Sequence, residues 1–251
     1  MKRLIVCICL PLLMVACGGK HADDVPAEGQ PATYLYSRER VSCRISAETA
    51  NPSLRIAVGE WMSERLGGYY DGDVTDMNAL VNFYGRAHTD SLRASLDEIR
   101  SDLDVDFEAE MRKAYETDQI VTYTLSTFLN LGGAHPTSDE MGATFRKSDG
   151  RRLTWDIIRC DRQYEFGQMT IESLKNYFGM DDNDLQQALG DQNYFNPPLP
   201  RTPPYFLENG VMLIYQQYEI AGYAMGMPSD TISYDRMAPL LTTWARRLTG
   251  K

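Results

Sequence analysis

The spacing of hydrophobic residues predicts two helices in succession in the first half of the chain. In both stretches the apolar residues recur three and four positions apart, which is the spacing of one helix face. The first stretch begins at Asn51 and Pro52, which suit the cap and the first helical position, and it ends at Gly67. The second stretch covers residues 76–99. We therefore expect two consecutive amphipathic helices.

Alternating apolar and polar residues predict strands on both sides of these helices. Residues 34–46 read as one strand before the first helix. After the second helix the same alternation appears over residues 105–112 and 121–131, and a shorter strand follows at 144–147. Short turns connect these stretches, so we expect a meander of antiparallel strands with one face covered by the helices.

The last third of the chain mixes both patterns around a proline-rich connector. Its expected elements are a helix over 163–178, a short helix over 181–190, a non-helical connector over 196–204, a hairpin turning at Asn209-Gly210, a strand over 230–234 and a helix over 237–248. The order of elements predicts an α+β fold, with mostly antiparallel sheets packed against amphipathic helices.

The first residues have the composition of an export signal. Lys2 and Arg3 precede an apolar run that is short for a membrane span, and small residues then lead to Cys17. The letters "MVAC" resemble the lipobox of bacterial lipoproteins, whose cysteine is diacylated and becomes the mature N-terminus. We expect residues 1–16 to be a signal peptide and Cys17 to carry two acyl chains, which suffice for stable anchoring. The alternatives are an ordinary signal cleaved near Ala16 and a non-cleaved anchor.

Composition indicates a tether and an acidic mature protein. Residues 17–33 are rich in Gly, Pro, Ala and acidic residues, as in a flexible linker. The net charge is -10, and without the two basic residues of the signal 23 basic residues face 35 acidic ones, which gives -12. This acidity argues against nucleic acid as a partner. It suits steering toward a cationic protein, and it also suits the solubility of an exported domain.

The cysteines leave one possible disulfide. Cys7 and Cys9 would leave with the signal and Cys17 would carry lipid, so Cys43 and Cys160 remain. In an oxidising envelope an even remainder suits a bridge. Two buried free thiols are the alternative, because the sequence does not give the distance between the two residues.

Two stretches of the chain resemble a known family. "LNLGGAHPTSDEMGATFRKSDGRRLTWDII" resembles the segment of RsiV/PdaC-type proteins in which a strand ends in a GGAH motif and a second strand and an acidic-Gly-Arg turn follow. "FLENGVMLIYQQYEIAGYAMG" resembles the end of the same family, with Gly222 in place of the usual proline. The resemblance implies two closely associated subdomains: a PdaC-like N-terminal domain over 34–155 and an RsiV-like domain, the domain of unknown function 3298, over 156–251.

The resemblance also implies a class of function. Some members of the family are anti-sigma factors whose extracellular part binds lysozyme, others lie beside a peptidoglycan deacetylase domain, and many are lipoproteins without an assigned role. This chain is similar to the last group. The resemblance implies a stand-alone lipoprotein of the bacterial cell envelope, anchored in the outer membrane and facing either the periplasm or the cell surface. Its expected partners are a lysozyme-like cationic protein or peptidoglycan fragments.

Residues suited to catalysis are few. The three histidines are His21, His88 and His135, and none lies in an HxxH or HExxH spacing. A zinc site needs three or four ligands. No CxxC or GxSxG motif occurs, and the paired aspartates and histidines of the deacetylases are missing. We therefore expect a protein that is not an enzyme and that binds no metal or cofactor.

His135 is nevertheless the first candidate for a site. It lies between small residues and Pro136, where a predicted strand ends. Gly132 and Gly133 permit a turn or a bulge, and the proline stops ladder pairing. We expect His135 to form a hydrogen bond across this turn or to line a small surface cleft. A histidine in such a place can also serve as a general base or a metal ligand.

The tyrosines near the end of the chain give the second half of the candidate surface. Tyr215, Tyr218 and Tyr223 cluster in "YQQYEIAGYAMG", and aromatic residues suit recognition as well as packing. The candidate binding surface comprises His135, Gly133, Glu219 and Tyr223. Two other functions remain open: a cell-wall hydrolase or deacetylase that uses His135 with a nearby acid, and a structural lipoprotein of a larger envelope complex.

Overall fold

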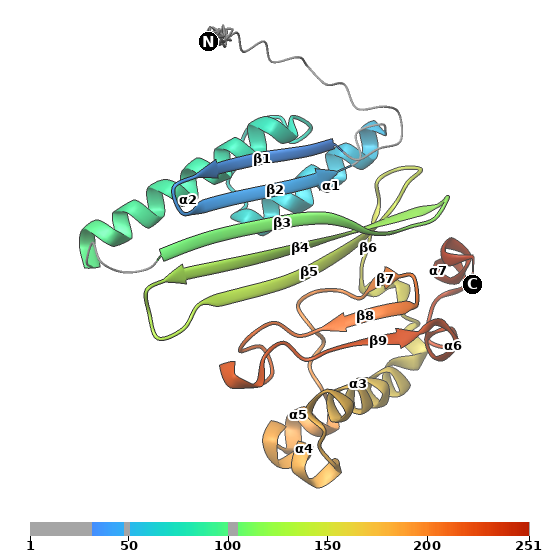
Figure 1. The fold of residues 1–251 in the computed structure, drawn as a ribbon. Coiled ribbons are helices and arrows are strands. Elements are labelled where there is room, and N and C mark those ends of the chain that lie inside the picture. The colour runs from blue at the N-terminus through green and yellow to red at the C-terminus, as the bar shows by residue number, and fades with distance from the viewer. Residues whose placement is uncertain (1–31, 48–50, 100–104, 251) are drawn as a thin grey trace, which may run out of the picture.

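The protein is an α+β structure with two sheets, as the sequence predicted. A computed structural model describes residues 32–47, 51–99 and 105–250. One sheet has six strands in the order β1-β2-β3-β4-β5-β6, and the other has three in the order β7-β8-β9 (Figure 1). The expected signal peptide, Cys17 and most of the tether lie outside the described residues.

The large sheet belongs to the first part of the chain. Its elements are β1 (Ala32–Arg38), β2 (Val41–Ala47), α1 (Pro52–Leu66), α2 (Met77–Ile99), β3 (Val105–Glu116), β4 (Ile120–Leu131), β5 (Thr137–Arg146) and β6 (Arg152–Leu153). Neighbouring strands are antiparallel except β2 and β3, which run parallel. A parallel pair needs a crossover connection, and α1 and α2 provide it. The expected antiparallel meander is therefore confirmed for β3 to β6 only.

The small sheet and the remaining helices form the second part. The elements are the 3-10 helices η1 (Trp155–Ile157) and η2 (Cys160–Arg162), α3 (Gln163–Phe178), α4 (Asp182–Leu189), α5 (Asp191–Phe195), β7 (Tyr205–Leu207), β8 (Gly210–Ile214), η3 (Tyr223–Met225), β9 (Ser229–Ser233), α6 (Tyr234–Met237) and α7 (Thr243–Thr249). The proline-rich connector is not helical, and the hairpin turns at the expected Asn-Gly pair.

The prediction of a single strand over residues 34–46 was wrong. This stretch is a hairpin, because the chain reverses at Glu39 and pairs β1 with β2. Glu39 has a φ of 55°, a left-handed conformation that is uncommon for a residue other than glycine. No glycine or proline marks this turn, so the usual sequence signal was absent.

The helix signals in the first half are confirmed. The side chain of Asn51 accepts a hydrogen bond from the backbone N–H of Leu54 at 3.1 Å, and Pro52 occupies the first helical position. Asp76 accepts from the N–H of Ala79 at 2.9 Å at the start of α2. Each cap satisfies a donor that lacks a partner within the helix, and this fixes where the helix begins.

Strand β5 separates the two parts of the molecule, because successive side chains of a strand point to opposite faces. Phe145 faces α1, where its ring meets that of Trp61 edge-on at 6.0 Å. On the other face, the hydroxyl of Thr144 accepts a hydrogen bond from the backbone N–H of Phe206 in β7. Residues 142–145 are all buried, since both faces of the strand are covered here.

Three hydrophobic clusters stabilise this arrangement. The first lies between the large sheet and α1 and α2, and the second lies between the large and small sheets and includes Ile120 of β4. The third is a small cluster among α3, α4 and the end of β8. Since Ile120 and Leu153 belong to the second cluster, that core draws on both parts of the chain.

Two boundaries in the second part differ from the prediction. The expected helix over 237–248 is interrupted at Pro239 and forms the two short helices α6 and α7. Proline lacks the backbone N–H that a continuous helix needs. The expected long strand after Gly210 ends at Ile214, and a loop follows. Over the described part of the chain, no helix combines the length and the apolar character needed to cross a bilayer.

Candidate functional site

The GGAH sequence forms the turn between β4 and β5. Gly132 has a φ of 71°, a left-handed conformation that glycine adopts without strain, and its N–H donates to the side chain of Asn130 at 3.0 Å. Gly133 is exposed and has no such φ, and an added Cβ there would meet nothing within 4 Å. Of the two glycines, only the first is therefore required by the backbone, and the turn carries His135 to the surface.

Two glutamine side chains form hydrogen bonds between the loop after β8 and the part of the β5 edge that does not pair with β6. The carboxamide of Gln216 accepts from the N–H of Glu140 at 2.9 Å and donates to its carbonyl oxygen at 2.7 Å. Gln217 accepts from the N–H of Ser138 at 2.9 Å. These bonds take the place of a neighbouring strand along this edge. The loop is thus held beside the GGAH turn.

Glu219 stabilises the same loop through hydrogen bonds to backbone N–H groups. Its carboxylate accepts hydrogen bonds from the backbone N–H groups of Gln216 at 2.7 Å and of Arg201 at 2.5 Å. Its side chain is only 7% exposed. Glu219 was expected at the surface, but both carboxylate oxygens are directed into the loop. It therefore positions the loop.

These connections bring His135 against two tyrosines. The ring of Tyr223 stacks on the imidazole with centroids 3.7 Å apart and planes 12° apart. The hydroxyl of Tyr218 lies 3.1 Å from Nε2 of His135. Tyr218 is 56% exposed, so this group, which we call the His–Tyr cluster (His135, Tyr218 and Tyr223), reaches the solvent. Aromatic rings with one polar end suit recognition of a partner.

The backbone of Tyr218 is constrained. Its φ is 62°, in the left-handed region that bulky residues rarely adopt. Its two neighbours in the chain, Gln217 and Glu219, are both held by side-chain hydrogen bonds to the backbone. Such conformations persist only where the surrounding contacts enforce them, and they are common at functional sites. The His–Tyr cluster is thus pre-formed.

The other tyrosine of this segment has a packing role. Tyr215 is buried, and its hydroxyl donates to the carbonyl oxygen of Pro198 in the connector at 2.7 Å. Burial raises the pKa of this phenol well above its usual value. The structure therefore separates the three tyrosines into one that packs and two that reach His135.

The two cysteines in the described part of the chain are free thiols. Cys43 is buried in β2, and burial raises the pKa of its thiol to about 12. Cys160 is exposed in η2. The structure thus describes neither the possible disulfide nor two buried thiols, but one buried and one exposed cysteine.

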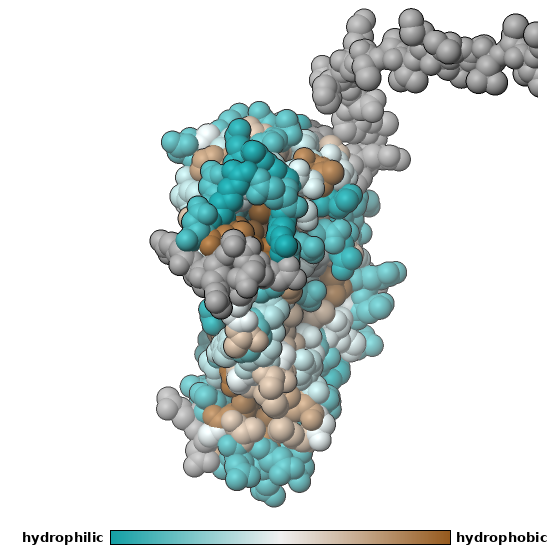
Figure 2. All heavy atoms as spheres, turned by 60° about the vertical axis from the view of Figure 1, so that its left-hand side comes forward, coloured by the Kyte–Doolittle hydropathy of each residue, from teal (hydrophilic) through white to brown (hydrophobic). Residues whose placement is uncertain are grey.

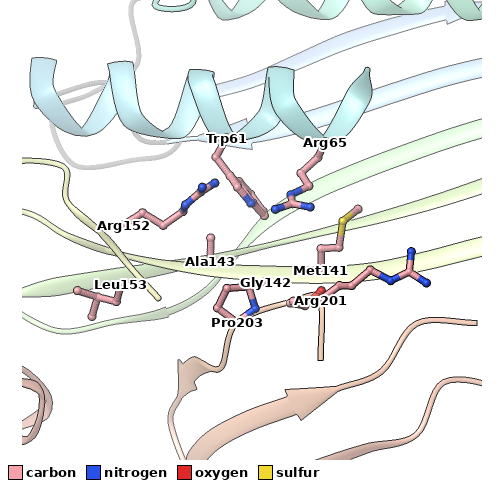
Figure 3. A pocket seen from close by; sticks show the side chains of 10 residues that line it. Trp61, Arg65, Met141, Gly142, Ala143, Arg152, Leu153, Arg201 and Pro203 are labelled. Atoms are coloured by element: carbon pink, nitrogen blue, oxygen red, sulfur yellow. The ribbon is translucent and has the colours of Figure 1, made fainter. Parts of the chain in front are cut away.

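Sequence reasoning missed two hollows. One is a cavity that contains the side chains of Arg65 and Arg152 (Figure 3). The other is a groove of about 630 Å³ along α3, where exposed apolar side chains such as Phe195 and Leu199 gather. Their residues come from separate segments of the chain, so no local motif could have indicated them. Among the described residues, no group of three or more His, Cys, Asp or Glu side chains could hold a metal ion.

The contact between the β4–β5 turn and the loop after β8, which we call the junction, lies at one side of the molecule. The β4–β5 turn and the loop between β8 and β9 occupy the same side in Figure 1. Figure 2 turns that side forward and shows hydrophilic residues over much of the upper part, a band of more apolar residues lower down, and hydrophilic residues again at the lower tip. The fold and the junction define a two-part α+β protein in which a turn of the first part meets a loop of the second.

Comparison with known proteins identifies the second part. Residues 155–235 match the family model described as a protein of unknown function, DUF3298, so the chain contains a DUF3298 domain. The match includes Tyr218, Glu219 and Tyr223, whereas His135 lies outside it. A search of the curated proteins gives no match.

Solved structures share the fold over most of the chain. A member of the DUF3298 family from Bacteroides fragilis superposes with a TM-score of 0.68 at 15% identity, covering 88% of this chain and 96% of that one. A DUF3298 family protein from Pseudomonas aeruginosa gives a TM-score of 0.56 at 18% identity, with 86% and 93% covered. At such identities the likeness concerns the fold, and it extends over both sheets.

Proposed function

We propose that this protein is a lipid-anchored binding protein of the bacterial cell envelope and that it is not an enzyme. The His–Tyr cluster is the centre of its binding surface. The proposal includes an RsiV/PdaC-type origin for the whole chain, with a PdaC-like first part preceding the DUF3298 domain. The localisation, in the outer membrane and facing the periplasm or the surface, is part of the same proposal.

One observation carries the proposal: His135 stacks on Tyr223 across the junction, and both belong to the two stretches that resemble the family. The polar partner of the imidazole is the hydroxyl of Tyr218. The carboxylate of Glu219, an acid of the same loop, accepts two backbone hydrogen bonds. The described side-chain partner of the imidazole is thus a phenol rather than a carboxylate, and an exposed aromatic group of this kind supports recognition.

Charge favours a cationic partner. The chain has a net charge of -10, and -12 once the two basic residues of the signal are removed. An acidic protein attracts a basic one over distances comparable to the Debye length, and aromatic side chains then supply the close contact. A cationic protein of the lysozyme kind fits both features, and the family resemblance names it.

The test is calorimetry of the purified protein with a c-type lysozyme at low and high salt, with a lysis assay alongside. We expect stoichiometric binding that weakens at high salt. Tyr223→Ala should weaken binding about tenfold, as truncation of a central aromatic contact does. Tyr164→Ala is the matched control, because it removes an exposed tyrosine of α3 outside the cluster. Protection from lysis would define the protein as an inhibitor.

Other outcomes are equally informative. Absence of heat with lysozyme would exclude this partner, and binding to purified peptidoglycan fragments would then identify the alternative ligand. Equal loss in both tyrosine variants would remove the His–Tyr cluster from the interface. Release of acetate or reducing ends from peptidoglycan, abolished by His135→Ala, would show that the protein is a hydrolase or deacetylase. Co-purification with a stable envelope complex would indicate a structural role.

A further inference from the structure

A second candidate site lies farther along β5, beside its pairing with β6. We propose that the cavity between α1, the β5–β6 edge and the connector binds a carboxylate group. Its walls include Trp61 and Arg65 of α1, Met141 of β5, Arg152 of β6 and Arg201 of the connector (Figure 3). Its volume of about 80 Å³ gives room for several water molecules, or for a small carboxylate. This proposal is independent of the proposed function, because it concerns other residues and another ligand.

The charge of the cavity walls is opposite to that of the whole protein. Three arginines contribute to the lining, and no acidic residue does. Arg65 and Arg152 extend toward Trp61 from opposite sides, whereas Arg201 is 71% exposed and points outward (Figure 3). In a chain with a net charge of -10, a convergence of guanidinium groups makes this a local positive site.

A single carboxylate balances the two inner arginines. One oxygen of Glu64 lies 2.9 Å from Arg65 and the other lies 2.8 Å from Arg152. Two positive charges therefore share one negative charge, which leaves a net positive charge facing the cavity. Glu64 is not part of the lining and contacts the guanidinium groups from beside it.

Arg65 has a donor without a partner. Its Nε is buried, and no acceptor in the described structure bonds to it. A buried N–H without an acceptor destabilises the folded protein, so such groups in native structures call for an explanation. A ligand oxygen in the cavity would satisfy this donor. Guanidinium groups bind carboxylates through two parallel hydrogen bonds, and a planar ligand matches that geometry.

The remaining walls favour a carboxylate over phosphate. Met141, Ala143, Leu153 and Pro203 supply apolar surface, which suits the aliphatic part of an organic acid. The hydroxyl of Thr202 already accepts from the side chain of Gln216 at 3.2 Å. Inorganic phosphate has no apolar part to contact this surface.

The alternative is that these arginines only tie α1 to β6 through Glu64. Substitution would then lower stability without any effect on a ligand. The experiment therefore records binding at the cavity itself.

The test is nuclear magnetic resonance of the purified protein, observing the Nε–Hε signals of arginine side chains during titration with propionate. We expect a saturable shift of the Arg65 signal. Arg152→Gln, observed at the Arg65 signal, and Arg65→Gln, observed at the Arg152 signal, should each weaken propionate binding about tenfold, the value of a charge-assisted hydrogen bond. The matched control is Arg86→Gln, which removes an exposed arginine of α2 outside the cavity.

Glu64→Gln gives a test whose expected result, tighter binding, could not arise from unfolding of the variant. It removes the internal counterion of both guanidinium groups, so propionate should bind about threefold more tightly. Weaker binding in this variant would overturn the proposal. So would an unchanged Arg65 signal at 100-fold more propionate than protein, or tighter binding of inorganic phosphate than of propionate at the same signal.

Discussion

The surroundings of His88 determine how one residue couples stability to pH. His88 belongs to α2, and its imidazole stacks on the ring of Phe107 in β3 with the ring centroids 3.6 Å apart. Burial lowers the pKa of His88 below its usual value of 6.5, and a backbone hydrogen bond to Leu66 opposes the shift. His88 lies within residues 76–99, the second helix that the sequence predicted, and the structure shows that its ring packs against β3.

The folded protein should lose stability below neutral pH because of this residue. As the pH falls through about 6.5, the unfolded chain takes up a proton on His88 before the folded protein does. The unfolded state then binds more protons, so the free energy of unfolding decreases until the pH reaches the lower pKa of the folded state. His88→Phe keeps an aromatic ring and removes the titration.

Urea unfolding of both proteins between pH 8 and pH 5 measures this effect. We expect the free energy of unfolding to decrease more steeply in the wild type than in His88→Phe. Contributions from carboxylates are common to the two proteins and cancel in the difference. Parallel profiles would show that His88 does not contribute.

At the scale of elements, the packing of β7 against the large sheet depends on a glycine in β5. A Cβ at Gly142 would lie 2.5 Å from ring carbons of Tyr205, which is buried on the strand with 4% exposure. Glycine at this position therefore allows β7 to approach the large sheet. Burial raises the pKa of Tyr205 well above its usual value, so the phenol remains neutral at the interface.

Gly142→Ala should lower the free energy of unfolding by roughly 1–3 kcal/mol, the usual cost of overpacking. Gly133→Ala is the matched control, because an added Cβ there meets nothing within 4 Å. We expect the control to change stability by less than about 0.5 kcal/mol. Equilibrium urea unfolding checks both values. Equal effects at the two glycines would contradict the packing argument.

Elements with local signals were predictable from the sequence. Asn51 and Pro52 fixed the start of α1, and Asn209 with Gly210 fixed the hairpin of β7 and β8, because each signal acts within a few residues. The reversal at Glu39 had no such signal. Strand β5 was predicted too short, since its first residues are polar and pair with glutamine side chains rather than with a hydrophobic layer.

The candidate site was only partly predictable for the same reason. His135 and Tyr223 were each selected from the sequence, but their stacking depends on Gln216 and Gln217 binding the edge of β5. Glu219 was selected as a surface residue, and its backbone hydrogen bonds across the loop gave no sequence signal. Contacts between segments far apart in the chain lie beyond patterns of spacing.

At the scale of the whole molecule, Cys17 is the residue that should decide where the protein resides. We expect Cys17→Ser to move the protein from the membrane fraction to the soluble fraction and to abolish incorporation of labelled palmitate, because the thioether-linked lipid cannot form. Cys9→Ser is the matched control, since that residue would leave with the signal. Fractionation of cells producing each variant checks the outcome. Retention of Cys17→Ser in the membrane would support a non-cleaved anchor instead.

Strand β5 also bears on how such proteins diverge. Its alternate residues contact α1 on one face and β7 on the other, so the same ten-residue strand contributes side chains to the packing on both faces. The two halves cannot be exchanged freely between relatives. A recombinant that joins this first half to a foreign DUF3298 domain must also supply a side chain that fits over Gly142 and a backbone donor for Thr144. We therefore expect the two halves to be inherited as one unit.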